Sequence, residues 1–154
     1  MNALELLKED HEKVSALFEQ AEAAKGHQQK KQVYEKIASE LETHTYIEET
    51  IFYPAIRESD DLKDLVLESI EEHKQVKTLI REINNLTGDN DKFDAKLTVL
   101  QENVEHHVEE EENDMFPQVE QYMDESRLEE LGRELEAAKI NFGKQRRSAS
   151  SARK

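Results

Sequence analysis

The chain has 154 residues, a formal net charge of −15 and charged side chains at 37% of its positions. This length fits one domain with a core of its own, and the acidic balance argues against nucleic acid or an anionic membrane as the main partner. No cysteine is present, which excludes disulfides, thiol catalysis and cysteine-based metal sites. We predict a cytoplasmic protein, because the sequence has no cysteine, no apolar signal-peptide stretch and no apolar run long enough to span a membrane.

Apolar side chains recur every three or four residues in successive segments, which is the pattern of one helix face. Short breaks rich in Gly, Asn, Asp or Ser, such as NNLTGDND, separate the first four stripes. In chain order the stripes run from Leu4 to Ala21, Val33 to Ala55, Leu62 to Ile83, Phe93 to Met115 and, in a shorter segment, Leu128 to Phe142. The second and fourth helices are expected to end near Pro54 and Pro117.

The predicted fold is all-α, an antiparallel up-down-up-down four-helix bundle built from two repeated helical hairpins over residues 1–122. A short additional helix over residues 123–142 is expected to pack across the outside or end of this bundle. The remaining residues, 143–154, read GKQRRSASSARK. Because this segment is basic, rich in Ser and without apolar periodicity, we predict a disordered tail.

The four long stripes contain polar residues where a helix core would have apolar ones. Each stripe holds one histidine, and the second and fourth also hold a glutamate four residues later. Ionised Glu is rarely buried without a partner, yet no Lys or Arg lies on the stripes. These carboxylates therefore need a compensating positive charge. The residues are His11, His44, Glu48, His73, His107 and Glu111.

The same residues form an internal repeat. His11 matches His73 at an offset of 62, and the motif HTYIEETIFYP from His44 matches HVEEEENDMFP from His107 at an offset of 63. Two such hairpins related by a pseudo-twofold would bring four His and two Glu to one point on the bundle axis. Because His and Glu at i and i+4 share a helix face about 6 Å apart, a His can bind a metal end-on while the carboxylate bridges two metals.

In these segments the sequence resembles a known family, the hemerythrin-like, HHE cation-binding domains. The resemblance covers about residues 1–122 and rests on DHEKV, HTYIEETIFYP, EHKQV and HVEEEENDMFP. It implies a non-haem di-iron site inside a four-helix bundle, with the four His as terminal ligands and Glu48 and Glu111 as bridges between two Fe ions. Ligand chemistry alone assigns imidazole and carboxylate without thiolate to Fe, Mn or Zn, and a carboxylate-bridged pair favours iron.

One position departs from the oxygen-carrying members of that family, which use five histidines. The place of the extra His, one turn before His73, is taken by Ser69, and its repeat equivalent is Leu7. Four His and two Glu make a more symmetric site with open positions or water on both metals. We therefore expect oxidant chemistry or sensing rather than simple O2 carriage.

Other polar and aromatic residues near the motifs are given structural roles. His27, in the first loop, and His106, about 100° around its helix from His107, are expected to be exposed. The aromatic and Met residues Phe52, Tyr53, Met115 and Phe116 are expected to shield the pocket from water, and Tyr34 is expected to pack in the core. Surface positions are expected for Glu49, Glu72, Glu109, Glu110 and Glu112, with the alternative for Glu72, next to His73, that it supports the metal ligands or replaces a missing one.

The leading hypothesis is a di-iron protein that handles small oxidants, with O2, peroxide or NO as the ligand at the metals. One alternative is a metal- or oxygen-responsive sensor or binding module, in which metal controls folding and partner exposure. Storage of O2 and a purely helical interaction protein with structural His are further alternatives. The sequence identifies no protein partner and does not decide whether the chain is an enzyme.

Overall fold

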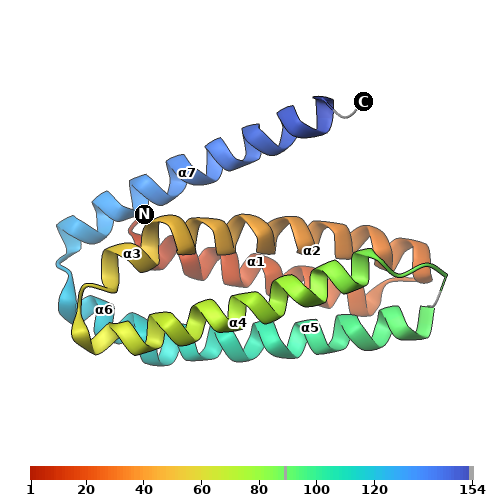
Figure 1. Cartoon of the computed structure of the whole chain (residues 1–154), viewed down its shortest axis with the longest axis horizontal. Coiled ribbons are helices and arrows are strands. Elements are labelled where there is room, and N and C mark those ends of the chain that lie inside the picture. The colour runs from red at the N-terminus through yellow and green to blue at the C-terminus, as the bar shows by residue number, and fades with distance from the viewer. Residues whose placement is uncertain (89, 153–154) are drawn as a thin grey trace.

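The computed structural model describes residues 1–88 and 90–152, and this part of the chain is helical apart from short connections, without a strand. Four helical rods lie side by side, and the chain reverses direction at each connection between them (Figure 1). None of the described helices has the length and apolar character needed to cross a membrane. The all-α prediction is confirmed. The rods are α1 (Ala3–Ala23); α2 (His27–Ile47) with η1 (Glu48–Phe52) and α3 (Tyr53–Ile56); α4 (Asp60–Asn84); and α5 (Asn90–Glu110) with η2 (Glu111–Met115) and α6 (Phe116–Tyr122).

The second and fourth rods each contain a π-helical turn, labelled η1 and η2, that begins at the glutamate of the repeated motif. The backbone N–H of Tyr53 donates to the carbonyl of Glu48, and that of Phe116 donates to Glu111, each across five residues. The second rod ends at Ile56, two residues after Pro54, as predicted, whereas the fourth rod continues past Pro117 to Tyr122. Proline clashes with the carbonyl four residues earlier in a regular helix, and the wider π turn relieves that clash.

A fifth helix, α7 (Glu125–Ala152), packs on the outside of the rods against α1, α2 and η1 (Figure 1). It is long, so the predictions of a short fifth helix and of a disordered tail from residue 143 are wrong as far as Ala152; residues 153–154 lie outside the described part. Two features explain the continued helix. The segment contains Ala, Lys, Gln and Arg, which favour helices, and the Arg146 guanidinium donates to the carbonyl and hydroxyl of Ser39.

The core consists of two apolar clusters separated by a polar layer. One cluster includes Leu7, Phe52 and Leu62 and also takes in the buried face of α7, and the other includes Ile37, Leu41 and Leu100. Between the clusters lie the six polar residues of the helix stripes, and each is no more than 6% exposed: His11, His44, Glu48, His73, His107 and Glu111. A buried polar layer of this kind is stable only if its groups find partners.

Candidate metal centre

One histidine from each rod directs its Nε2 atom into the polar layer, where it meets Glu48 or Glu111. Glu48 Oε1 lies 3.1 Å from Nε2 of His44 and 3.2 Å from that of His73. Glu111 lies 3.2 Å from Nε2 of His107 and 3.0 Å from that of His11. Each carboxylate therefore contacts one histidine of its own hairpin and one of the other hairpin, as the repeat predicted.

Several of these atoms are buried and have no hydrogen bond in spite of their proximity. They are both carboxylate oxygens of Glu48, Oε1 of Glu111, and Nε2 of His11 and His44. Ligand atoms of His11, His44, Glu48 and Glu111 lie within 4.8 Å of one another, as do those of Glu48, His73 and His107. Since Glu48 belongs to both groups, the arrangement fits two neighbouring cations that share a carboxylate.

A second set of carboxylates binds the outer nitrogen of every histidine. The Nδ1 atoms of His11, His44, His73 and His107 lie 2.6, 3.0, 2.7 and 2.7 Å from carboxylate oxygens of Glu112, Asp10, Glu49 and Glu72, respectively. An ionised carboxylate only accepts, so each Nδ1 carries a proton, and each Nε2 is the nitrogen that faces the inner carboxylates. With Nδ1 protonated, each imidazole would bind a metal through Nε2, once any proton on Nε2 has been lost.

The outer carboxylates obey the same pseudo-twofold as the inner ligands. Asp10 and Glu72 each precede the lone His of a hairpin and bind the second His of that hairpin. Glu49 and Glu112 each follow an inner glutamate and bind the lone His of the other hairpin. Surface positions were predicted for three of the four, and Asp10 was not considered. Their adjacency to a candidate ligand in both repeats was the signal that could have identified them.

Charge coupling within the layer shifts the pKa values of its members. Burial alone lowers the pKa of His44, but the negative charge of Glu48, the hydrogen bond to Asp10 and the close contact with Glu48 raise it to about 10. Burial raises the pKa of Glu48, but the charge of His44 and the close contacts with three histidines hold it well below its usual value. Without metal, the layer therefore pairs an ionised Glu48 with a protonated His44, and metal binding at His44 must displace a proton.

Tyr53 also reaches into the layer. Its hydroxyl donates to Glu111 Oε2 at 2.6 Å and lies 3.3 Å from Nε2 of His73. It also interacts with Ser69, which is buried at the position where a fifth His was considered. Burial and the two inner carboxylates raise the pKa of this phenol well above its usual value, so it keeps its proton. Tyr53 was predicted to shield the pocket; it is buried, but its hydroxyl belongs to the centre.

A small cavity of about 20 Å³ adjoins the centre. His11, His44 and His107 line it together with apolar side chains from every one of the four rods: Val14, Leu41, Val76, Val104 and Val108. At the other end of the layer, Phe52, Met115 and Phe116 are no more than 1% exposed. The centre is thus enclosed by apolar groups, as expected from the sequence.

Comparison with known families agrees with this arrangement. The model of the hemerythrin HHE cation binding domain matches residues 2–119. The chain belongs to this hemerythrin HHE family. The match includes every residue of the inner and outer sets described above. The cluster of buried His and Glu is consistent with the cation binding from which the family takes its name.

Two individual relatives of this HHE chain were found. A crystal structure of a hemerythrin HHE cation binding domain-containing protein from Mycobacterium kansasii, a homolog of Rv2633c, superposes with a TM-score of 0.80 at 25% identity. The alignment covers 92% of this chain and 87% of that one. A DNA nickase from Nostoc sp. (strain PCC 7120) is 26% identical over 90% of this chain. The chain spans only 39% of the length of the nickase.

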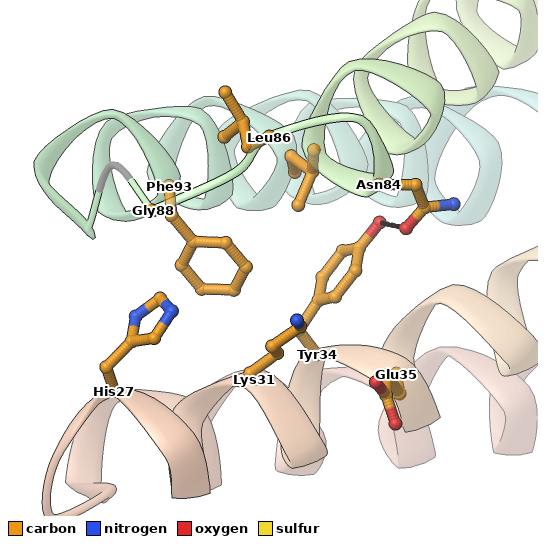
Figure 2. Close-up of a pocket in the computed structure, with 9 residues that line it drawn as sticks. His27, Lys31, Tyr34, Glu35, Asn84, Leu86, Gly88 and Phe93 are labelled. Carbon is orange, nitrogen blue, oxygen red and sulfur yellow. Dashed lines mark hydrogen bonds between the residues drawn. The ribbon is translucent and has the colours of Figure 1, made fainter.

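His106, His27 and Tyr34 contribute no atom to the inner set of ligands. His106 is exposed, as predicted, and its Nε2 lies 3.0 Å from Glu110. The loop position predicted for His27 is wrong: it begins α2, is half-buried and packs edge-on against Phe93 (Figure 2). Tyr34 packs in the same region and donates to Asn84. Along α2, His27 lies roughly 25 Å from His44 and Tyr34 roughly 15 Å from it.

Proposed function

We propose that this chain is a non-haem di-iron protein that handles small oxidants, namely O2, peroxide or NO. His11, His44, His73 and His107 would be terminal ligands, and Glu48 and Glu111 would bridge two irons; Mn or Zn would be less suitable. The observation that carries this proposal is the pair of overlapping ligand groups that share Glu48. When bound, a carboxylate-bridged iron pair supplies the electron transfer to oxidants that protein side chains lack.

The enclosure of the centre supports a small, weakly polar ligand. A cavity of about 20 Å³ exceeds the roughly 10–15 Å³ that one water-sized molecule needs, but admits little more. Its apolar lining favours diatomic molecules over larger polar substrates. His11, His44 and His107 border this cavity, so a ligand placed there would lie beside the inner nitrogens.

Side chains of the layer would also hold the protons that the reaction needs. Reduction of an oxidant consumes protons, and Tyr53 holds one at its hydroxyl oxygen, 2.6 Å from Glu111. The outer carboxylates keep the Nδ1 protons of the four imidazoles in place, so the ring orientation is fixed during any change of charge. Phe52 and Phe116 exclude water from the layer.

An optical experiment tests this function. The protein is reconstituted with ferrous iron under anaerobic conditions, oxidised in air and treated with peroxide or azide. We expect near-ultraviolet absorption after oxidation and an additional visible charge-transfer band with either anion. The control is a protein that carries Glu48→Ala and Glu111→Ala, which should show neither band. A reconstituted parent that binds iron but yields no band with peroxide or azide would contradict access of small ligands to the metals.

A metal-responsive sensor is the second candidate, and one contact favours it. Lys139 of α7 donates to Asp10, whose other oxygen accepts from His44. Metal occupancy can thereby influence a helix on the outer face of the molecule. A cytoplasmic location and the absence of a nucleic-acid or membrane partner stay predictions from composition.

A further inference from the structure

The two halves of the metal centre differ in their outer contacts. Asp10 and Glu72 occupy equivalent repeat positions, and each accepts from a histidine of its own hairpin. The second oxygen of Asp10 accepts from Lys139 of α7. The second oxygen of Glu72 instead lies 3.8 Å from Nε2 of the exposed His106. The Lys139–Asp10 contact therefore connects α7 to the half of the centre that contains His44.

The contact with Lys139 lies largely inside the protein. Asp10 is 3% exposed, and the Lys139 side chain is 31% exposed. A carboxylate at this depth is stable as an anion only if its oxygens are satisfied, and Asp10 has one strong donor on each oxygen, His44 and Lys139. Loss of the Lys139 ammonium would leave Asp10 free to rotate and His44 without a fixed partner.

The position of Lys139 depends on how α7 is docked. Before it in the helix, Leu128, Leu131 and Leu135 are buried against the rods. After it, Arg146 bonds Ser39 of α2, and Phe142 stacks on Tyr46 at a centroid distance of 4.5 Å. Lys139 thus lies between the buried leucines on one side and the contacts of Phe142 and Arg146 on the other, and it reaches Asp10 only while α7 is packed against the rods.

We propose that Lys139 is a positioning residue for the metal centre, and that metal binding at the half containing His11 and His44 and docking of α7 stabilise each other. Such coupling is reciprocal: if a seated α7 raises metal affinity, bound metal must hold α7 more firmly by the same factor. This inference rests on metal binding at the centre and is independent of the oxidant chemistry.

The test uses Lys139→Met, which keeps the long side chain but removes the charge, and Lys139→Arg, which restores the charge. Lys74→Met is the matched control, because Lys74 is 65% exposed and pairs only with Glu71 among the contacts described. Affinity for Fe2+ is measured by anaerobic competition with a chelator. Docking of α7 is measured by hydrogen exchange of residues 133–146 with and without Fe2+.

For the parent we expect Fe2+ to slow exchange in α7. We expect Lys139→Met to weaken binding of one of the two ions by about tenfold or more, because loss of a group that holds a metal ligand in place typically lowers affinity by that factor. The other ion should bind nearly as in the parent. Fe2+ should then no longer slow exchange in α7. Lys74→Met should behave as the parent, and Lys139→Arg should recover most of the affinity.

Three results would overturn the proposal. The first is a Lys139→Met protein with parental affinity for both ions. The second is an equal loss at both ions together with lower thermal stability, which would indicate a general structural role. The third is a parent whose α7 exchanges at the same rate with and without metal, a result that needs no variant to fold. A parent that binds no metal would contradict the metal centre itself, and the inference would fall with it.

Discussion

Oε1 of Glu48, in the first hairpin, lies 3.2 Å from Nε2 of His73 in the second hairpin. The same oxygen is 3.1 Å from Nε2 of His44 on its own rod. A carboxylate that contacts both hairpins serves both halves of the centre, so its loss should affect two ions and not one.

We therefore expect Glu48→Ala and Glu111→Ala each to abolish binding of both ions, because each removes a shared carboxylate. Metal content per chain after ferrous reconstitution measures this. Matched controls are Glu109→Ala, an exposed position on the same rod as Glu111, and His27→Ala and His106→Ala, which lie outside the centre. If His106→Ala strips metal as effectively as Glu111→Ala, the assignment of ligands on the fourth rod is wrong.

Metal affinity should rise with pH between about 7 and 10. Without metal, the pKa of His44 is raised to about 10 by Glu48 and Asp10 in spite of burial, so this imidazole must lose a proton before it binds metal. Each proton released makes affinity about tenfold higher per pH unit. Chelator competition with Zn2+ at a series of pH values measures the slope. A flat profile over this range would show that His44 does not exchange a proton for metal.

Stability of the metal-free protein should change in the opposite direction. A histidine whose folded pKa is raised stabilises the fold fully below its unfolded pKa of about 6.5. That contribution is lost as the pH rises toward the folded pKa of about 10. Urea unfolding of metal-free protein should therefore show lower stability at pH 9 than at pH 6.5. The metal-bound protein should not show this loss, since its imidazoles are neutral at both values.

Tyr53→Phe should destabilise the metal-free protein by about 1–3 kcal/mol, because Glu111 loses a buried donor that lies 2.6 Å away. Tyr46→Phe, at a position that is 38% exposed, is the control and should have little effect. Thermal unfolding measures the difference. Equal stability of the two variants would mean that the phenol contributes nothing to the polar layer.

Much of this arrangement could be predicted from the sequence. The stripes placed His11 and Glu48 in the core because a 3.6-residue period identifies a buried helix face. The structure brings together all six predicted residues. The outer carboxylates could not be assigned in this way, because Glu49 and Glu72 lie off the buried stripe and reach histidines of neighbouring rods. Their role depends on rod packing, which periodicity does not give.

The errors had local physical causes. Pro117 was expected to lie near a helix end, but a π turn allows the fourth rod to continue to Tyr122. The segment from Gly143 lacks apolar periodicity, and its helix is held by a polar contact, Arg146 with Ser39, that a hydrophobic pattern does not record.

Docking of α7 can be tested with a pair of glycines. A Cβ at Gly132 would clash with the backbone oxygen of Met1, whereas one at Gly143 would have no neighbour closer than 3.9 Å. We expect Gly132→Ala to destabilise the protein by about 1–3 kcal/mol through overpacking. Gly143→Ala should stabilise α7 by about 0.5–1 kcal/mol, because Ala favours helix. Chemical denaturation of both variants measures this, and a neutral Gly132→Ala would contradict the close contact between α7 and the N-terminus.

The central claim, a centre built for two irons, is tested most directly by the iron content per chain. The protein is incubated with ferrous iron in anaerobic buffer, freed of excess metal and analysed for iron and protein together. We predict two iron ions per chain for the parent and none for the chain with Glu48→Ala. One ion per chain, or none, in a folded parent would contradict the paired centre.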